Sequence, residues 1–321
     1  MRYHFPSLLA ALLSPLLLQT LFAEPEKSVD ALQAEFMKLK FGMFIHYNME
    51  TYHGVQWVEG YKDPATFNPG VESIDTDAWA DAAKAAGMTY AVLTTKHVSG
   101  FSLWDSEFTE YDVMHPACPY KKDIVAQFVK SFTSRGLKVG LYYCWRHPGF
   151  DAKFKVLPPE CDPATHTFDE QVAFQKKQIA ELMRKYPECF YIWHDGYDEK
   201  VGTPEALLSE LRAVRPDVLH GGNWWDWNKK GTPFLDVALK EMRDISEDNT
   251  AVAETCWTLE EKGWFWNPEF KTIDAATVLK YLTTANARHS NLLLNVGPDR
   301  KGNILPSSIA VLKEVGATRK P

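Results

Sequence analysis

The sequence predicts an α/β protein, a single-domain (β/α)8 barrel of the TIM type. Strand-like apolar runs alternate with amphipathic helical segments from about residue 40 onwards, which is typical of a parallel sheet with right-handed crossovers. Seven clear strands, with an eighth expected between Phe234 and Asp248, fit the usual length of a closed barrel. No GxGxxG or P-loop motif follows the first strand, which disfavours a nucleotide-binding doubly wound sheet.

The elements follow one another in a regular order. Strands are expected at 40–47, 89–97, 138–145, 189–195, 218–224, 251–257 and 290–298. Helices are expected at 75–88, 121–136, 168–187, 203–216, 272–288 and 305–316. Asp75 fits the N-cap of the first of these helices and Gly87 its end. The chain stops soon after the last helix, and no composition shift marks a second domain, so the catalytic domain is expected to span 24–321.

Composition excludes some classes of function. The chain has 321 residues, a formal net charge of -7 and a pI near 5.8, which argues against binding of nucleic acid. Aromatic residues make up 13%, with 11 Trp; their faces suit sugar rings, although Trp also fills cores. The five cysteines show no metal-type spacing, so neither a metal nor a cofactor is expected. Cys118 and Cys161 lie in expected loops, and the sequence leaves open whether they pair.

The first 23 residues have the pattern of a secretory signal peptide. A short region with one Arg precedes the apolar run SLLAALLSPLLLQTLFA, and the polar EPEKSVD follows, which predicts cleavage near Ala23. Pro15 interrupts a run that is already short for a membrane span. The mature protein is therefore expected to be secreted or periplasmic, without stable membrane association.

Polar or aromatic side chains end almost every expected strand. They are His46 and Tyr47, Lys96 and His97, Tyr143 and Trp145, Asp195, Asn223 and Trp224, and Asn295. In a barrel of this type the carboxyl ends of the strands meet at one face, which carries the active site. The pattern therefore predicts a polar pocket at that face.

Two carboxylates indicate which chemistry this pocket performs. Asp195 and Glu254 each interrupt an otherwise apolar strand, and cleavage of a glycoside needs two such groups. Burial of Glu254 would raise its pKa, as a general acid requires, while Asp195 would stay ionised as the nucleophile. A retaining enzyme would hold the two carboxyl groups about 5–5.5 Å apart. The alternatives are a turn role for Asp195 and an ion-pair role for Glu254, with Glu59, Glu260 and Glu261 as its rivals.

Several motifs in sequence order carry a resemblance to a known family. They are FGMFIHY, FNPG with DAWADAAKAAGMTYAVLTTKH, SGFSLWDS, GLKVGLYY, WHDG, AETCWT with GWFW, and NLLLNVGP. In this combination the chain resembles the α-L-fucosidases of glycoside hydrolase family 29, over about residues 40–304. The resemblance covers the catalytic barrel and not the C-terminal β-sandwich that family members often carry.

The resemblance implies roles for individual residues. It implies a retaining mechanism in which Asp195 of WHDG is the nucleophile and Glu254 of AETCWT is the acid/base. It also implies substrate contacts from a further set of residues: His46, Gln56, Trp57, His97, Tyr143 and Trp193. The chain departs from the family where Val98 and Ser99 replace a His and an Asp, and where Gln56 replaces a Glu.

Three functions are compatible with this pattern. The first is an exported, retaining exo-α-L-fucosidase that removes terminal fucose from oligosaccharides or glycoconjugates by double displacement. The second is the same machinery acting on a related sugar such as an α-L-galactoside, because lost hydrogen-bonding groups change which sugar is accepted. The third is a fucose-binding protein without catalysis, against which the intact Asp195 and Glu254 argue.

Overall fold

Eight parallel strands close into a barrel in sequence order. The computed structural model describes residues 27–58, 61–145, 165–197, 202–223 and 235–319. The strands are β1 (Phe41–Ile45), β2 (Tyr90–Lys96), β3 (Lys138–Cys144), β4 (Cys189–Asp195), β5 (Leu219–Asn223), β6 (Val237–Glu241), β7 (Ala253–Thr258) and β8 (Ser290–Val296). Each pairs with the next, and β8 pairs with β1. The predicted barrel is confirmed, and so is the eighth strand in the segment where the sequence was hard to interpret.

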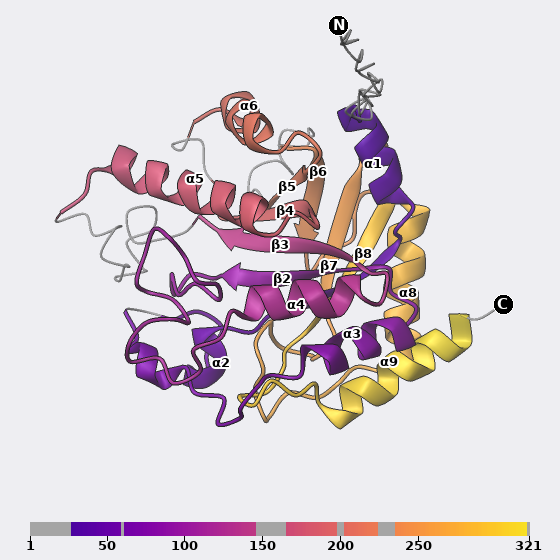
Figure 1. Cartoon of the computed structure of the whole chain (residues 1–321). Coiled ribbons are helices and arrows are strands. Elements are labelled where there is room, and N and C mark those ends of the chain that lie inside the picture. The colour runs from indigo at the N-terminus through magenta and orange to yellow at the C-terminus, as the bar shows by residue number, and fades with distance from the viewer. Residues whose placement is uncertain (1–26, 59–60, 146–164, 198–201, 224–234, 320–321) are drawn as a thin grey trace, which may run out of the picture.

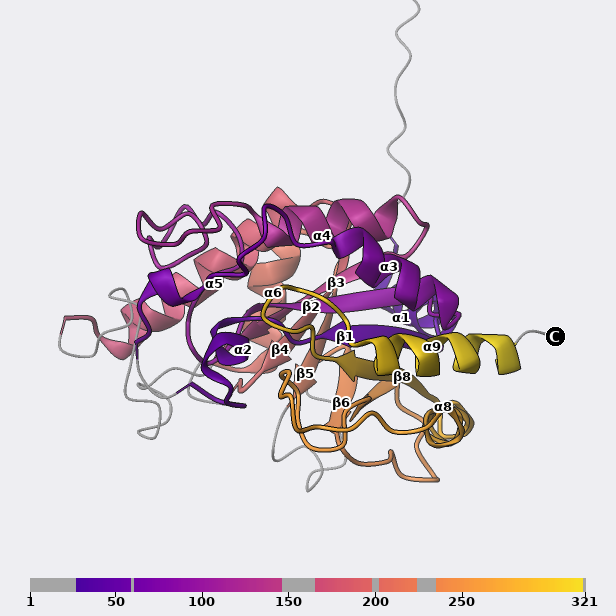
Figure 2. The same ribbon diagram turned by 90° about the horizontal axis from the view of Figure 1, so that it is seen from below.

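Helices cover the outside of the barrel (Figure 1). They are α1 (Val29–Met37), α2 (Met49–His53), α3 (Thr76–Ala85), α4 (Ile124–Thr133), α5 (Phe168–Lys185), α6 (Pro204–Val214), α8 (Ala275–Ala287) and α9 (Pro306–Arg319), with a short 3-10 helix at Pro64–Thr66. All six predicted helices are present, and Asp75 caps α3 as expected. Figure 2 shows α3 and α9 side by side on one flank. None of the helices in the described ranges is long and apolar enough to cross a membrane.

Side chains alternate between the inside of the barrel and the layer beneath the helices, as the strand repeat of two requires. One buried cluster fills the interior and includes Tyr142 on β3, Trp193 on β4 and Leu239 on β6. A second cluster joins the outer faces of the strands to the helices and includes Leu141 and Ile192. Which cluster a residue joins therefore decides whether it can reach a site inside the barrel.

Helix α1, which the sequence analysis did not predict, covers the amino end of the barrel (Figure 1). Its Phe36 is 1% exposed, and its ring lies 5.9 Å from that of Tyr90 and 5.1 Å from that of Tyr191. Gly42 and Gly221 face these two tyrosines, and a Cβ at either position would overlap a tyrosine ring or hydroxyl. The half of the barrel at the amino ends of the strands is thus a packed core.

Candidate active site

Asp195 ends β4 on the inner face of the barrel, two residues after the inward-facing Trp193. The hydroxyl of Tyr142 donates a hydrogen bond of 2.6 Å to Oδ2 of Asp195. The Tyr142 ring stacks on that of Trp193, with centroids 5.2 Å apart, so its position is fixed from below. A carboxylate held in this way is oriented by a hydrogen bond to its charged oxygen.

The third-strand tyrosine at the site is Tyr142, and the contact predicted for Tyr143 is wrong. Tyr143 points outwards, where its hydroxyl donates to Oε1 of Gln178 on α5 at 2.8 Å. The reason is the alternation of the strand: Tyr142 belongs to the interior cluster and Tyr143 to the outer one. The run GLYYC is apolar on both faces, so the sequence carried no alternation that could have distinguished the two.

His46 follows β1 and is 3% exposed. Its Nδ1 lies 2.6 Å from Oδ1 of Asn295 on β8, and Nδ2 of Asn295 donates to the carbonyl of Trp264 at 2.7 Å. This second bond fixes the amide of Asn295 so that Oδ1 accepts, and Nδ1 of His46 therefore carries the hydrogen. Burial, and then the neighbouring His97, lower the pKa of His46 well below its ordinary value. His46 is thus neutral, and its Nε2 is an acceptor for a hydroxyl group.

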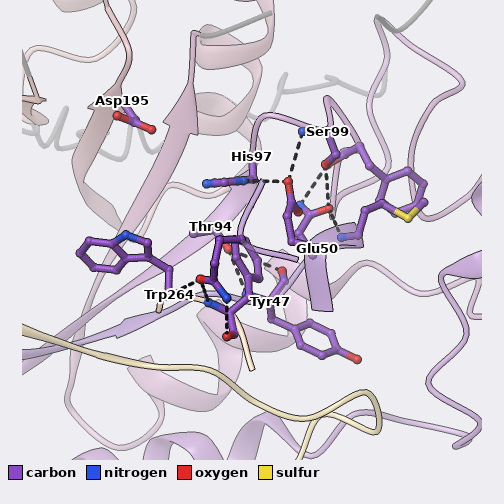
Figure 3. A network of polar contacts seen from close by, with 12 residues as sticks. Tyr47, Glu50, Thr94, His97, Ser99, Asp195 and Trp264 are labelled. Carbon is purple, nitrogen blue, oxygen red and sulfur yellow. Dashed lines mark hydrogen bonds and ion pairs between the residues drawn. The ribbon is translucent and has the colours of Figure 1, made fainter. Parts of the chain in front are cut away.

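His97 follows β2 and is held by Glu50 on α2. Its Nδ1 donates to Oε1 of Glu50 at 2.7 Å, and the backbone N–H of Ser99 donates to the same oxygen at 3.3 Å. In Figure 3, His97 lies between Glu50 and Asp195. Its ring stacks on that of Tyr142 at 5.8 Å. Glu50 is fully buried, so it positions His97 from a place that solvent does not reach.

Gln56 holds a loop rather than facing the interior. Its Oε1 accepts from the backbone N–H groups of Trp264 and Phe265 at 2.6 and 3.0 Å, and its Nε2 donates to the carbonyl of Phe265. The held loop brings the Trp264 ring to 5.0 Å from that of His46. Gln56 therefore shapes the site through Trp264, while its neighbour Trp57 is 53% exposed. The sugar contacts expected of Gln56 and Trp57 stay predictions.

Glu254 lies deep in the barrel. Its Oε2 accepts from the Tyr90 hydroxyl at 2.5 Å, and its Oε1 accepts from the Tyr191 hydroxyl at 3.3 Å and the Trp193 indole at 3.0 Å. Burial raises the pKa of Glu254 to about 7, and the three hydrogen bonds oppose this rise. The raised pKa agrees with the expectation for a general acid. Complete burial among three donors weighs against that role, because a proton donor must reach the glycosidic oxygen.

The rivals of Glu254 lie elsewhere. Glu260 is buried outside the barrel interior and accepts from Ser308 at 2.9 Å, while Glu261 is exposed. Glu59, Trp224, Cys161 and the expected signal peptide fall outside the described residues. Cys118 is a buried free thiol.

Sequence reasoning missed the residues that orient the site. Tyr142 and Glu50 were not singled out, and Asn295 was noted only as a strand end. Glu50 precedes no motif and sits in a helix of five residues, so no spacing indicated its buried position. Among the described residues no group of three or more His, Cys, Asp or Glu could hold a metal ion.

The assembled groups suit recognition of a sugar and cleavage of its glycosidic bond. An oriented carboxylate, a neutral imidazole acceptor and a second imidazole held by a carboxylate lie close together, since the rings of His46 and His97 are 5.9 Å apart and both lie near the ring of Tyr142, which holds Asp195. Trp264 offers an aromatic face of the kind that packs against a sugar ring. Such a set can bind hydroxyl groups directionally while a carboxylate meets an electron-poor carbon.

Comparison with known proteins gives a consistent result. The family model described as Alpha-L-fucosidase matches residues 19–318. The chain is 25% identical to Alpha-L-fucosidase 1 of Arabidopsis thaliana over 319 residues, covering 88% of this chain and 58% of that protein. It is 28% identical to the plasma alpha-L-fucosidase of Homo sapiens over 354 residues, covering 94% and 71%.

A solved structure adds the fold. Alpha-L-fucosidase isoenzyme 1 from Paenibacillus thiaminolyticus superimposes with a TM-score of 0.73 at 30% identity, covering 90% of this chain and 75% of that one. The chain spans less than two thirds of the length of several curated relatives that it matches, including the plant protein.

Proposed function

Because the chain belongs to the α-L-fucosidase family, we propose that it is a retaining exo-α-L-fucosidase, a glycoside hydrolase that releases terminal α-L-fucosyl residues. The observation that carries the proposal is the placement of Asp195 at the inner end of β4, fixed by Tyr142 and faced by the imidazoles after β1 and β2. This is the face of a (β/α)8 barrel at which catalytic groups gather.

In the proposed reaction Asp195 attacks C1 of the fucosyl unit and forms a glycosyl ester. The leaving oxygen takes a proton from a second carboxyl group, which then deprotonates the water that hydrolyses the ester. His46 accepts a hydrogen bond from a sugar hydroxyl through Nε2, and His97 contributes a second directional contact. The sequence names Glu254 as the second carboxyl group, and this side chain is fully buried.

The proposed substrate is a fucosylated oligosaccharide or glycoconjugate. Export to the periplasm or the outside of the cell is proposed from residues 1–23 alone, and such a location would bring the enzyme to glycans. Nothing in the proposed chemistry needs a metal or an organic cofactor, since two carboxyl groups suffice for double displacement.

The test is hydrolysis of an aryl α-L-fucoside, with NMR detection of the first sugar anomer released. Release of α-L-fucose supports both the substrate and retention of configuration. Asp195→Ala is expected to abolish turnover nearly completely while fucose binding is kept. Wild-type turnover with an unchanged kcat in Asp195→Ala would remove Asp195 from the mechanism.

A related sugar is the second candidate substrate. Val98 replaces a polar family residue and is 3% exposed within the interior cluster, and the Gln56 amide is directed to a loop backbone. Both features remove hydrogen-bonding groups from around the sugar. Comparison of kcat/KM for aryl α-L-fucoside and α-L-galactoside distinguishes the two substrates. Binding of fucose without turnover of either would indicate a protein that only binds the sugar.

A further inference from the structure

The level of each residue along the barrel axis can be read from the strand registers. Asp195 pairs with Asn223 on β5, and the offset of Gly221 with Val237 continues this row to Leu239 on β6. Leu239 pairs with Glu254 on β7. A row of hydrogen bonds thus joins Asp195 to Glu254, but a row is not level in a barrel whose strands tilt.

The tilt shifts the level by a known amount. Barrels of this fold have a shear of about eight residues over eight strands, or about one residue per strand. Following the registers here from β1 through β8 and back returns to a lower residue of β1. A residue level with Asp195 therefore lies one position further towards the carboxyl end for every strand crossed.

This correction places Glu254 and a second carboxyl group, Glu241, at different levels. On β6, two strands after β4, the residue at the same level as Asp195 is Glu241. On β8, four strands after β4, it is Asn295. Glu254 lies about three residues below the level of Asp195 on β7, which is roughly 8 Å along the axis at the usual rise and tilt. The hydrogen bonds of Glu254 to Tyr90 and Tyr191 agree with this depth.

Glu241 also lies on the correct face. Val237 and Leu239 of β6 belong to the interior cluster, so alternation places Glu241 on the inner face at the end of the strand. It pairs with Cys256 of the same cluster. Unlike Glu254, it is partly exposed, as expected of a residue at the open end of the barrel. In this fold alternate strands supply the side chains of one layer, and β4 and β6 are alternate strands.

The charges of Asp195 and Glu241 act on the same neighbours. Burial, the charge of Asp195 and more weakly that of Glu241 are among the causes that raise the pKa of Tyr142 well above its usual value. Both carboxylates also contribute to raising the pKa of Cys256, after burial and the charge of Glu254. Glu241 therefore lies near the hydroxyl group that holds Asp195.

We propose that Glu241, at the inner carboxyl end of β6 and level with Asp195, is the general acid/base, and that Glu254 is a structural carboxyl group of the core. The inference rests on the proposed glycosidase function. In the first step Asp195 bonds to C1, the bond from C1 to the glycosidic oxygen breaks, and that oxygen takes the proton of Glu241. In the second step Glu241 takes a proton from water, the water oxygen bonds to C1 and the ester bond to Asp195 breaks.

The test compares three folded variants, Glu241→Ala, Glu254→Gln and the exposed control Glu261→Gln, on fucosides with good and poor leaving groups. Removal of the acid costs about 10²–10⁴-fold in rate where the leaving group needs a proton. Glu241→Ala is thus expected to lose about 10³-fold in kcat/KM on phenyl α-L-fucoside, and less than about tenfold on the 2,4-dinitrophenyl fucoside. Glu261→Gln is expected to match the wild type on both.

Azide supplies an independent readout that a merely structural role would not give. In Glu241→Ala, azide can attack the glycosyl ester without a general base, so it should raise turnover of the dinitrophenyl fucoside and yield α-L-fucosyl azide. The proposal would be overturned if the Glu254→Gln or Glu254→Ala variant, and not Glu241→Ala, showed the dependence on the leaving group and formed the azide product. A wild type inactive on both fucosides would contradict the proposed function itself, whereas an active wild type with an unaffected Glu241→Ala contradicts only this inference.

Discussion

The Tyr142 hydroxyl lies 2.6 Å from Oδ2 of Asp195 and donates to it. The bond connects the inner faces of β3 and β4 at the open end of the barrel. The orientation of the proposed nucleophile therefore depends on Tyr142, whose ring stacks on those of His97 and Trp193.

Tyr142→Phe should therefore reduce turnover without unfolding the protein. A hydrogen bond to a charged group contributes about 1.5–3 kcal/mol, so we expect a fall of about 10–100-fold in kcat/KM. The matched control is Tyr143→Phe, which removes the outward bond to Gln178 and should leave kcat/KM within about twofold. Equal activity of the two variants on an aryl fucoside would show that Tyr142 does not orient Asp195.

The raised pKa of Glu254 predicts a pH-dependent stability. The folded state binds the proton of Glu254 more tightly, with a pKa of about 7 against an ordinary value of 4.5. Between these values Glu254 carries more protons in the folded protein than in the unfolded chain, so its contribution to the free energy of unfolding falls as pH rises from about 4.5 to 7 and is level above that.

Glu254→Gln removes this dependence. The difference in unfolding free energy between variant and wild type should change by about 3 kcal/mol in favour of the variant over that window. Urea unfolding at several pH values measures it. Glu260, whose pKa is also raised to about 7 by burial, is common to both proteins and cancels. Parallel pH curves for the two proteins would contradict the assigned pKa.

Glu50 is expected to affect substrate affinity through His97. Glu50→Gln weakens the bond to Nδ1 of His97, so the imidazole loses orientation, and KM should rise about tenfold with a smaller change in kcat. Ser99→Ala keeps the backbone N–H that reaches Glu50 and serves as the control. A drop in kcat alone would assign Glu50 to the chemical step and not to binding.

Phe36 should contribute strongly to stability. Its ring is buried against Tyr90 and Tyr191, and truncation of a buried Phe to Ala costs about 3–5 kcal/mol. Phe36→Ala should show this loss in chemical unfolding, while Tyr61→Ala, at a residue 46% exposed, should stay within about 1 kcal/mol of wild type. A small effect of Phe36→Ala would mean that α1 is not part of the folded core.

The barrel could be predicted from the sequence because the same pattern, a buried strand followed by an amphipathic helix, recurs along the chain. Asp195 was found because a carboxylate after CFYIWH breaks an apolar run. Tyr142 was missed because β3 is apolar on both faces. The depth of Glu254 could not be read from its strand alone, since level in a barrel depends on the tilt and register of other strands. Glu241 lies in a segment that carried no clear repeat.

The packed amino half of the barrel closes the candidate site at one end. Phe36, Tyr90, Tyr191 and Glu254 close the interior at its amino end, so in the proposed reaction the sugar, the departing glycan and the incoming water would all pass the carboxyl end of the barrel. A glycan chain could not thread through a barrel closed in this way, which fits the proposed release of terminal units. In the proposed reaction, water would then reach C1 from the side that the departing glycan has left, so hydrolysis of the ester would follow that departure.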